Sequence, residues 1–284
     1  MKIFHLFTNR LFLLLFAAAI VVIAGGVFLW QRHHPASANT TTTPTPSKTK
    51  SAAPQYPKVE TYQVPILMYH YIRNAEGESE LGKGLSVSPQ NFDAHLKWLA
   101  DNNYETLKVS DLADPDKTAL SKIASEKKKP VAITFDDGYL DAYTNALPVL
   151  KKYNATATFY IIRKYVGKPE YMNQAQIDEL EKFGYEIGSH TLSHPDLTKI
   201  DLGDAQKQIF DSKSSATAFC YPAGKYDATT VKLVQEAGYT TAVTTHFGIA
   251  SEKSSILELP RVRVENGSGE TLGFKIEAAF EQTK

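Results

Sequence analysis

Two kinds of hydrophobic pattern divide the chain. Residues 11–30 form an apolar run without a charged residue, whereas beyond residue 64 short apolar runs alternate with segments of helical periodicity. The first pattern is long enough for one membrane-spanning helix. The second is typical of β-strands that alternate with amphipathic helices, and it predicts an α/β domain built on parallel strands.

The alternating region predicts seven short strands and five helices. The expected strands are residues 65–69, 131–135, 156–162, 185–188, 218–221, 241–244 and 257–259. The expected helices are residues 90–102, 142–153, 174–183, 204–212 and 229–237. In the first helix, Phe92, Leu96 and Leu99 share one face and Ser88 is a suitable N-cap. The charged stretch 114–129 is predicted to be a solvated loop.

The N-terminal region is expected to place the folded domain outside the cell. Lys2 and Arg10 precede the apolar run, which favours a cytoplasmic N-terminus and an uncleaved membrane anchor. The alternative is cleavage after Ala38 within the small-residue sequence Ala36-Ser37-Ala38, which would release a secreted protein. The predicted parts are a cytoplasmic N-terminus with a single-pass signal-anchor at residues 1–34, a disordered Thr/Ser/Pro tether at 35–60 and one folded domain at 61–284.

Composition narrows the range of partners. The chain has 31 Lys+Arg and 31 Asp+Glu, so there is no net field to attract nucleic acid, and a neutral polymer fits better. We expect no nucleic-acid partner and a monomeric protein. The single cysteine, Cys220, cannot form an intramolecular disulfide, so an exported domain of this sequence must be stable through its core alone.

The first polar cluster with possible chemistry follows directly on a predicted strand. Asp136 and Asp137 come after the apolar residues 131–133, at the carboxyl end of the strand, where parallel α/β folds build their sites. Two adjacent carboxylates are useful when one binds a metal and the other acts as a base. Taken alone, however, Asp-Asp-Gly is equally good turn chemistry.

The second cluster consists of two histidines four residues apart. His190 and His194 follow another predicted strand, and with one carboxylate they complete a three-ligand site that leaves a coordination position open. Such a pair also occurs by chance. Gly188 and Pro195 place it on a turn rather than on a metalloprotease helix, which would require a glutamate after the first histidine.

Three motifs follow one another along the chain: Thr134-Phe135-Asp136-Asp137-Gly138, His190-Thr191-Leu192-Ser193-His194 and Tyr221-Pro222-Ala223-Gly224. In this order they resemble the motifs of the polysaccharide deacetylase family, the NodB-homology carbohydrate esterases. The resemblance implies that residues 61–284 form one catalytic domain with a distorted (β/α) barrel of about seven parallel strands. It implies that Asp136 is the general base. It also implies that Asp137, His190 and His194 hold one divalent metal ion, with zinc expected and cobalt or nickel as alternatives.

The third motif departs from the family pattern at two positions. The family carries a tyrosine where this chain has Ala223, but the expected function there is that of a backbone N–H at the oxyanion, which Ala223 retains. The family carries an arginine beside the catalytic aspartate where this chain has Cys220. We therefore expect Arg261, or secondly Arg263, to take over that contact. The alternative is that both arginines are ordinary surface residues and that Cys220 is a small buried side chain.

The general acid is not found at the C-terminal position usual in the family. Instead, an apolar strand ends at His70, an arrangement similar to the permuted subgroup of poly-N-acetylglucosamine deacetylases, so His70 is the expected acid and His246 the alternative. The resemblance implies hydrolytic removal of N-acetyl groups, with release of acetate, from a cell-surface polysaccharide that contains N-acetylglucosamine, either poly-N-acetylglucosamine or peptidoglycan. The alternatives are an O-acetyl esterase of the xylan type and a carbohydrate-binding surface protein without catalysis.

Overall fold

The computed structural model describes residues 56–283. The predicted signal-anchor, the proposed cleavage site after Ala38 and most of the predicted tether lie outside these residues. Within residues 56–283, no helix is both long and apolar enough to cross a membrane.

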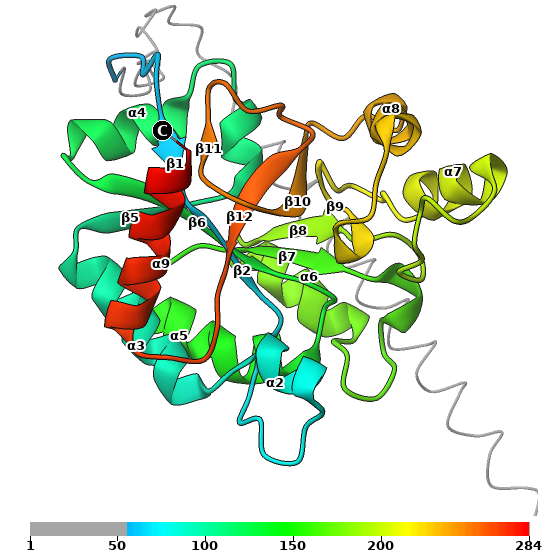
Figure 1. Cartoon of the computed structure of the whole chain (residues 1–284), viewed down its shortest axis with the longest axis horizontal. Coiled ribbons are helices and arrows are strands. Elements are labelled where there is room, and N and C mark those ends of the chain that lie inside the picture. Colours follow the sequence, from blue (N-terminus) through cyan, green and yellow to red (C-terminus); the bar gives the residue numbers. More distant parts are fainter. Residues whose placement is uncertain (1–55, 284) are drawn as a thin grey trace, which may run out of the picture. The chain divides into compact units, whose positions relative to one another are not determined.

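Seven parallel strands close into a barrel, which confirms the expected fold class (Figure 1). Their order around the barrel is β2-β12-β10-β9-β8-β7-β6, and pairing of β6 with β2 closes it. The barrel strands are β2 (Ile66–Tyr69), β6 (Lys129–Phe135), β7 (Thr158–Ile161), β8 (Glu186–Ser189), β9 (Ala218–Cys220), β10 (Thr241–Phe247) and β12 (Leu259–Arg263). An eighth strand, β5 (Tyr104–Leu107), pairs with the first half of β6 outside the ring.

Helices surround the barrel (Figure 1). The α-helices are α2 (Glu80–Leu85), α3 (Pro89–Asp101), α4 (Thr118–Ser125), α5 (Leu147–Lys152), α6 (Gln174–Lys182), α7 (Leu202–Phe210), α8 (Ala228–Glu236) and α9 (Gly269–Gln282). Shorter helical turns are η1 (Val109–Ala113), η2 (Ala142–Ala146), η3 (Arg163–Tyr165) and η4 (Pro222–Gly224). Two small sheets pair β1 (Gln63–Val64) with β11 (Ala250–Ser251) and β3 (Tyr71–Ile72) with β4 (Ser86–Val87).

Local sequence explains why α3 begins and packs where it does. The Ser88 side chain accepts a hydrogen bond from the Asn91 N–H, and Pro89 occupies the first helical position, where its missing N–H costs nothing. Phe92, His95, Leu96 and Leu99 are buried, in the spacing of one helical face. The predicted cap and apolar face are therefore confirmed.

The alternation of side chains along the strands decides which residues point into the barrel, toward the carboxyl-terminal ends of its strands. In β6, Val131, Ile133 and Phe135 pack toward the surrounding helices, whereas Ala132 belongs to the cluster inside the barrel. Because successive side chains of a strand point to opposite faces, Thr134 and Asp136 also face the interior. In β9 the same rule sends Phe219 outward and Cys220 inward.

Several predicted elements differ from the structure. The supposed solvated loop at residues 114–129 contains α4, whose Leu120 and Ile123 are buried, so that prediction was wrong. The last barrel strand begins at Leu259 rather than ending there, and runs through Pro260. The predicted helix at residues 142–153 is divided into the π-helical turn η2 and α5. The strand β5 and the helices α2 and α9 were not predicted.

Candidate active site

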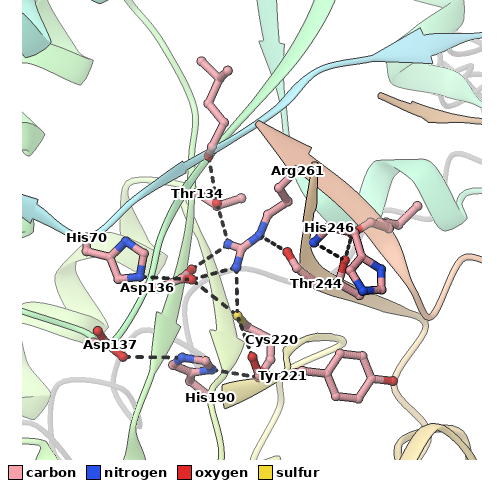
Figure 2. Close-up of polar contacts among 12 residues, drawn as sticks. His70, Thr134, Asp136, Asp137, His190, Cys220, Tyr221, Thr244, His246 and Arg261 are labelled. Carbon is pink, nitrogen blue, oxygen red and sulfur yellow. Dashed lines mark hydrogen bonds and ion pairs between the residues drawn. The ribbon is translucent and has the colours of Figure 1, made fainter. Parts of the chain in front are cut away.

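A buried ion pair lies inside the carboxyl-terminal rim of the barrel (Figure 2). Arg261 on β12 donates from Nη1 to Asp136 Oδ1 and from Nη2 to Asp136 Oδ2, both at 2.7 Å. Its Nε donates to the Thr244 carbonyl at 2.7 Å, and Nη1 also donates to Thr134 Oγ1 at 3.0 Å. The sequence did not single out Thr134 or Thr244 for this role. The four contacts fix the guanidinium, which in turn fixes the carboxylate.

This pair controls the protonation state of Asp136. Burial alone would raise the pKa of Asp136, but the charge of Arg261 and its hydrogen bonds outweigh burial and hold that pKa well below the usual range. The carboxylate is therefore ionised at neutral pH, as a general base must be. Arg263, the second candidate from the sequence, instead lies at the surface, where it donates to the Gly84 carbonyl at 3.3 Å.

Cys220 occupies the space beside this pair. The cysteine is fully buried, and its Sγ lies 3.4 Å from Arg261 Nη2 and 3.6 Å from Asp136 Oδ2. Burial raises the pKa of the Cys220 thiol, so the group remains neutral. The small side chain leaves the room that the guanidinium of Arg261 fills.

His70, directly after β2, faces Asp136 from another side (Figure 2). Its Nε2 lies 3.8 Å from Asp136 Oδ2, and the side chain is 15% exposed, so His70 contacts both the base and the solvent side of the site. Burial lowers the pKa of His70, although Asp136 and Asp137 act to raise it. His246, by contrast, is exposed near the end of β10, with Nδ1 3.4 Å from the Tyr226 hydroxyl.

The three expected metal ligands come together at the same rim. Asp137 Oδ1 lies 3.4 Å from His190 Nε2 and 3.6 Å from His194 Nε2. A tetrahedral ion with bonds of about 2.1 Å holds its ligand atoms roughly 3.4 Å apart, so the three donors fit one zinc-sized ion. The same donor set also suits cobalt or nickel.

A hydrogen bond to the main chain orients His190 for this role. Its Nδ1 lies 2.7 Å from the Cys220 carbonyl, which can only accept, so Nδ1 carries the proton and Nε2 offers a lone pair toward Asp137. A second group of donor atoms within 4.8 Å of one another among the described residues is Asp136, His190 and Cys220. In that group Arg261 already binds both Asp136 oxygens, so the Asp137 group is the better metal site.

Several site residues have a left-handed backbone that is uncommon for side-chain-bearing residues. The φ values are 72° at Asp137, 59° at His194 and 51° at Ala223. Ala223, in η4, is exposed, which leaves its backbone accessible to a bound substrate. Strained backbone of this kind is concentrated at functional sites, because the surrounding structure must hold it.

Gly188, near the end of β8, explains part of the histidine motif. A Cβ at this position would lie 2.4 Å from Tyr160 Cδ1 and 3.1 Å from the Ala218 carbonyl oxygen. Only glycine therefore lets β8 pass the buried Tyr160 ring and continue to His190.

Comparison with known proteins agrees with this geometry. A sequence model described as polysaccharide deacetylase matches residues 124–242, which include both aspartates and both histidines of the site. The chain is 37% identical over 225 residues to YxkH of Bacillus subtilis, a protein placed by its name among polysaccharide deacetylases, and the match covers 76% of this chain and 77% of YxkH. The chain belongs to the polysaccharide deacetylase family.

Two further relatives of this deacetylase family member have more specific names. The chain is 26% identical to the poly-β-1,6-N-acetyl-D-glucosamine N-deacetylase of Staphylococcus epidermidis over 76% of this chain and 83% of that enzyme. The solved structure of the Streptococcus pyogenes deacetylase PplD in complex with acetate superposes with a TM-score of 0.66 at 31% identity. That superposition covers 75% of this chain and 98% of PplD.

Proposed function

We propose that this polysaccharide deacetylase is a metal-dependent hydrolase that removes N-acetyl groups from an N-acetylglucosamine polymer. The observation that carries the proposal is the side-by-side arrangement of two differently held carboxylates. Asp137 lies with two histidine nitrogens at metal-ligand spacing, whereas Asp136 is held ionised by Arg261. Such a division between a metal ligand and a separate base suits the addition of water to an acetamide.

The residues of this chain take distinct parts in the reaction. Asp136 removes a proton from water as the water oxygen bonds to the acetyl carbon, and the Ala223 N–H donates to the oxyanion that develops. When the carbon–nitrogen bond breaks, His70 gives a proton to the leaving nitrogen, so the products are acetate and a free amine. Arg261 keeps Asp136 fixed and charged throughout.

Asp137, His190 and His194 would hold the divalent ion. When bound, the ion supplies Lewis acidity that polarises the acetyl carbonyl and makes water more acidic. The proton on His190 Nδ1, held by the Cys220 carbonyl, keeps the imidazole in the tautomer that metal binding requires.

The substrate is proposed from the relatives and from charge. Two staphylococcal relatives are named for action on poly-β-1,6-N-acetyl-D-glucosamine, and the balanced charge of this chain suits a neutral polymer. Peptidoglycan glycan strands contain the same acetamido group and are the second candidate. An O-acetyl esterase would use the same residues, so substrate assays must distinguish these activities.

The test is acetate release by the soluble fragment of residues 57–284. We expect release from β-1,6-linked N-acetylglucosamine oligomers or from peptidoglycan, loss of activity after chelation and recovery with zinc. Release from acetylated xylan alone would favour the esterase, and binding of a glycan without any release of acetate would favour the non-catalytic alternative.

We also propose that the N-terminal region anchors the domain at the outer face of the cell membrane. The support is the uncharged run at residues 11–30 with Lys2 and Arg10 before it. The full chain should sediment with membranes and lose its domain to external protease in intact cells. A mature N-terminus beginning after Ala38 in the culture medium would instead establish secretion.

A further inference from the structure

Four tyrosines form a row of rings in contact, beside the proposed metal ligand Asp137. Tyr71 begins β3, Tyr139 follows β6, Tyr165 ends η3, and Tyr171 lies between η3 and α6. The ring centroids are 4.0 Å apart for Tyr71 and Tyr139, 5.0 Å for Tyr139 and Tyr171, and 4.9 Å for Tyr171 and Tyr165. All four side chains are partly exposed. We call these residues the tyrosine row.

Main-chain and charged contacts hold this row rigid. Tyr139 and Tyr171 form an antiparallel β-bridge, with the Leu140 N–H donating to the Glu170 carbonyl at 2.8 Å and the Met172 N–H donating to the Gly138 carbonyl at 3.0 Å. At the other end, the Arg73 guanidinium lies 3.8 Å from the centroid of the Tyr71 ring. The row therefore joins the segments that follow β2, β6 and β7, and these contacts favour one arrangement of the rings before a ligand binds.

The hydroxyls of the row differ from those of the structural tyrosines. Tyr143 donates its hydroxyl hydrogen to Glu179 Oε2 at 2.6 Å, Tyr221 donates to the Leu257 carbonyl at 3.0 Å, and Tyr239 donates to the Ile209 carbonyl at 3.0 Å. Among the hydrogen bonds between described residues, none joins a hydroxyl of the row to a protein group outside it. Within the row, the Tyr139 hydroxyl hydrogen-bonds to the hydroxyls of Tyr71 and Tyr171, and the remaining hydrogen-bonding capacity of the three phenols is available to a ligand.

Chain position places the row beside the proposed catalytic residues, because Tyr71 directly follows His70 and Tyr139 lies two residues after Asp137. Burial raises the pKa of Tyr71, Tyr139 and Tyr171, and the Asp137 carboxylate acts in the same direction on each of them. Because each ring packs against the next in a tilted or edge-on arrangement, the row offers a ligand mainly its hydroxyls.

We propose that the hydroxyls of Tyr71, Tyr139 and Tyr171 bind the ring hydroxyls of the sugar unit whose acetyl group is removed, and so place the acetamide over Asp136. This inference rests on the proposed deacetylase function. A pyranose ring carries several hydroxyls that both donate and accept, and a rigid row of phenols can satisfy them without reordering. The row would therefore favour sugar substrates over small acetyl compounds.

The test is Tyr139→Phe, which removes the central hydroxyl and retains the ring and its contacts. On β-1,6-linked and β-1,4-linked N-acetylglucosamine pentamers, KM should rise about five- to tenfold, the effect of one lost hydrogen bond. Hydrolysis of 4-nitrophenyl acetate and the zinc content should stay unchanged. The matched control is Tyr143→Phe, whose hydroxyl contacts only Glu179, and its KM should remain that of the wild type.

Two results would overturn the inference. One is an unchanged KM for both pentamers in Tyr139→Phe. The other is an equal loss on the pentamers and on 4-nitrophenyl acetate, because Tyr139 would then act on the metal site or on the fold rather than on the sugar.

Calorimetric binding of the same pentamers separates this inference from the proposed function. If the wild type binds a pentamer without releasing acetate and Tyr139→Phe weakens that binding, the sugar site stands and the deacetylase proposal fails. If the wild type neither binds nor cleaves either pentamer, both fail.

Discussion

At the position of Cys220, the polysaccharide deacetylases that this sequence resembles carry an arginine that pairs with the catalytic aspartate. Here the guanidinium comes from Arg261 on β12 and reaches the same carboxylate across the barrel interior. Cys220 on β9 and Arg261 on β12 are separated by β10 in the closed barrel, and both side chains are buried. The catalytic aspartate is therefore paired with a guanidinium in both cases, but in this chain the arginine that supplies it lies on a different strand.

Replacing Arg261 tests this arrangement. Arg261→Lys keeps the positive charge but loses the paired hydrogen bonds to Asp136, so we expect kcat/KM for acetate release to fall by about 100-fold or more. The control is Arg263→Lys, a surface position on the same strand, which should change the rate by less than about twofold. Similar losses in both variants would contradict the role of Arg261.

Sequence alone could identify most of the residues that meet in the site, but not how they are held. The motifs located both aspartates and both histidines because each pair follows a predicted strand. Thr134 and Arg261 are 127 positions apart in the sequence, so their contact depends on the packing of the barrel and cannot be predicted from a local pattern. The left-handed backbone of Ala223 could not be predicted either, since alanine rarely adopts that conformation.

At the scale of elements, the two glycines of α9 allow this helix to pack closely against α3. A Cβ at Gly269 would lie 2.5 Å from Trp98 Cβ and 2.8 Å from the Ala94 carbonyl oxygen, and at Gly273 it would lie 2.4 Å from Trp98 Cζ2. The same glycines are the reason why α9 was not predicted, because glycine lowers intrinsic helix propensity. Close packing outweighs that cost here.

A pair of glycine substitutions measures this contact. Gly269→Ala should destabilise the domain by about 1–3 kcal/mol, because the methyl group must push α9 away from α3. Gly203→Ala in α7 meets nothing within 4 Å and should stabilise the domain by about 0.5–1 kcal/mol. Urea unfolding checks both; a neutral Gly269→Ala would show that the helices can separate freely.

The buried His95 makes stability depend on pH. Tyr69 donates to His95 Nδ1 at 3.1 Å, His95 Nε2 donates to the Gly267 carbonyl at 2.9 Å, and burial lowers the pKa of His95 from 6.5 to about 4. Above pH 6.5 the histidine is neutral in both states and costs nothing. As pH falls from 6.5 toward 4, the unfolded chain takes up the proton first, so stability is lost.

Between pH 7 and pH 5 this single group should lower the free energy of unfolding by about 2 kcal/mol. In His95→Gln, that part of the pH dependence should disappear, and the two proteins in the same metal state should differ in slope. Parallel curves of unfolding free energy against pH would mean that His95 has the same pKa in the folded and the unfolded chain.

Other elements show where local patterns failed. Proline usually marks the end of a strand, so the strand was predicted to end at Leu259. In the structure β12 begins at Leu259 and continues through Pro260. In α4 the charged residues conceal a short apolar face formed by Leu120 and Ile123. Burial of that face depends on the neighbouring β6 and is not visible in the segment itself.

At the scale of the whole molecule, closure of the barrel allows the proposed acid, His70, to precede the other site residues in the chain. The β2 strand, which ends before His70, lies between β12 and β6, so the first and last barrel strands in sequence are neighbours in space. The expected barrel could be predicted because the motifs imply it and the strands alternate with helices. The pairing of β5 outside the ring could not, since three of its four residues are only partly buried and the strand lacks a clear apolar run.

The most direct test of the account is Asp136→Asn in the fragment of residues 57–284, assayed together for zinc content and for acetate release. The substitution keeps the shape of the side chain and removes the base, while Asp137, His190 and His194 are untouched. We predict about one zinc per chain, as in the wild type, with acetate release from N-acetylglucosamine oligomers reduced at least roughly 1,000-fold. Release within tenfold of the wild type, or loss of the zinc, would contradict the separation of base and metal ligands at this site.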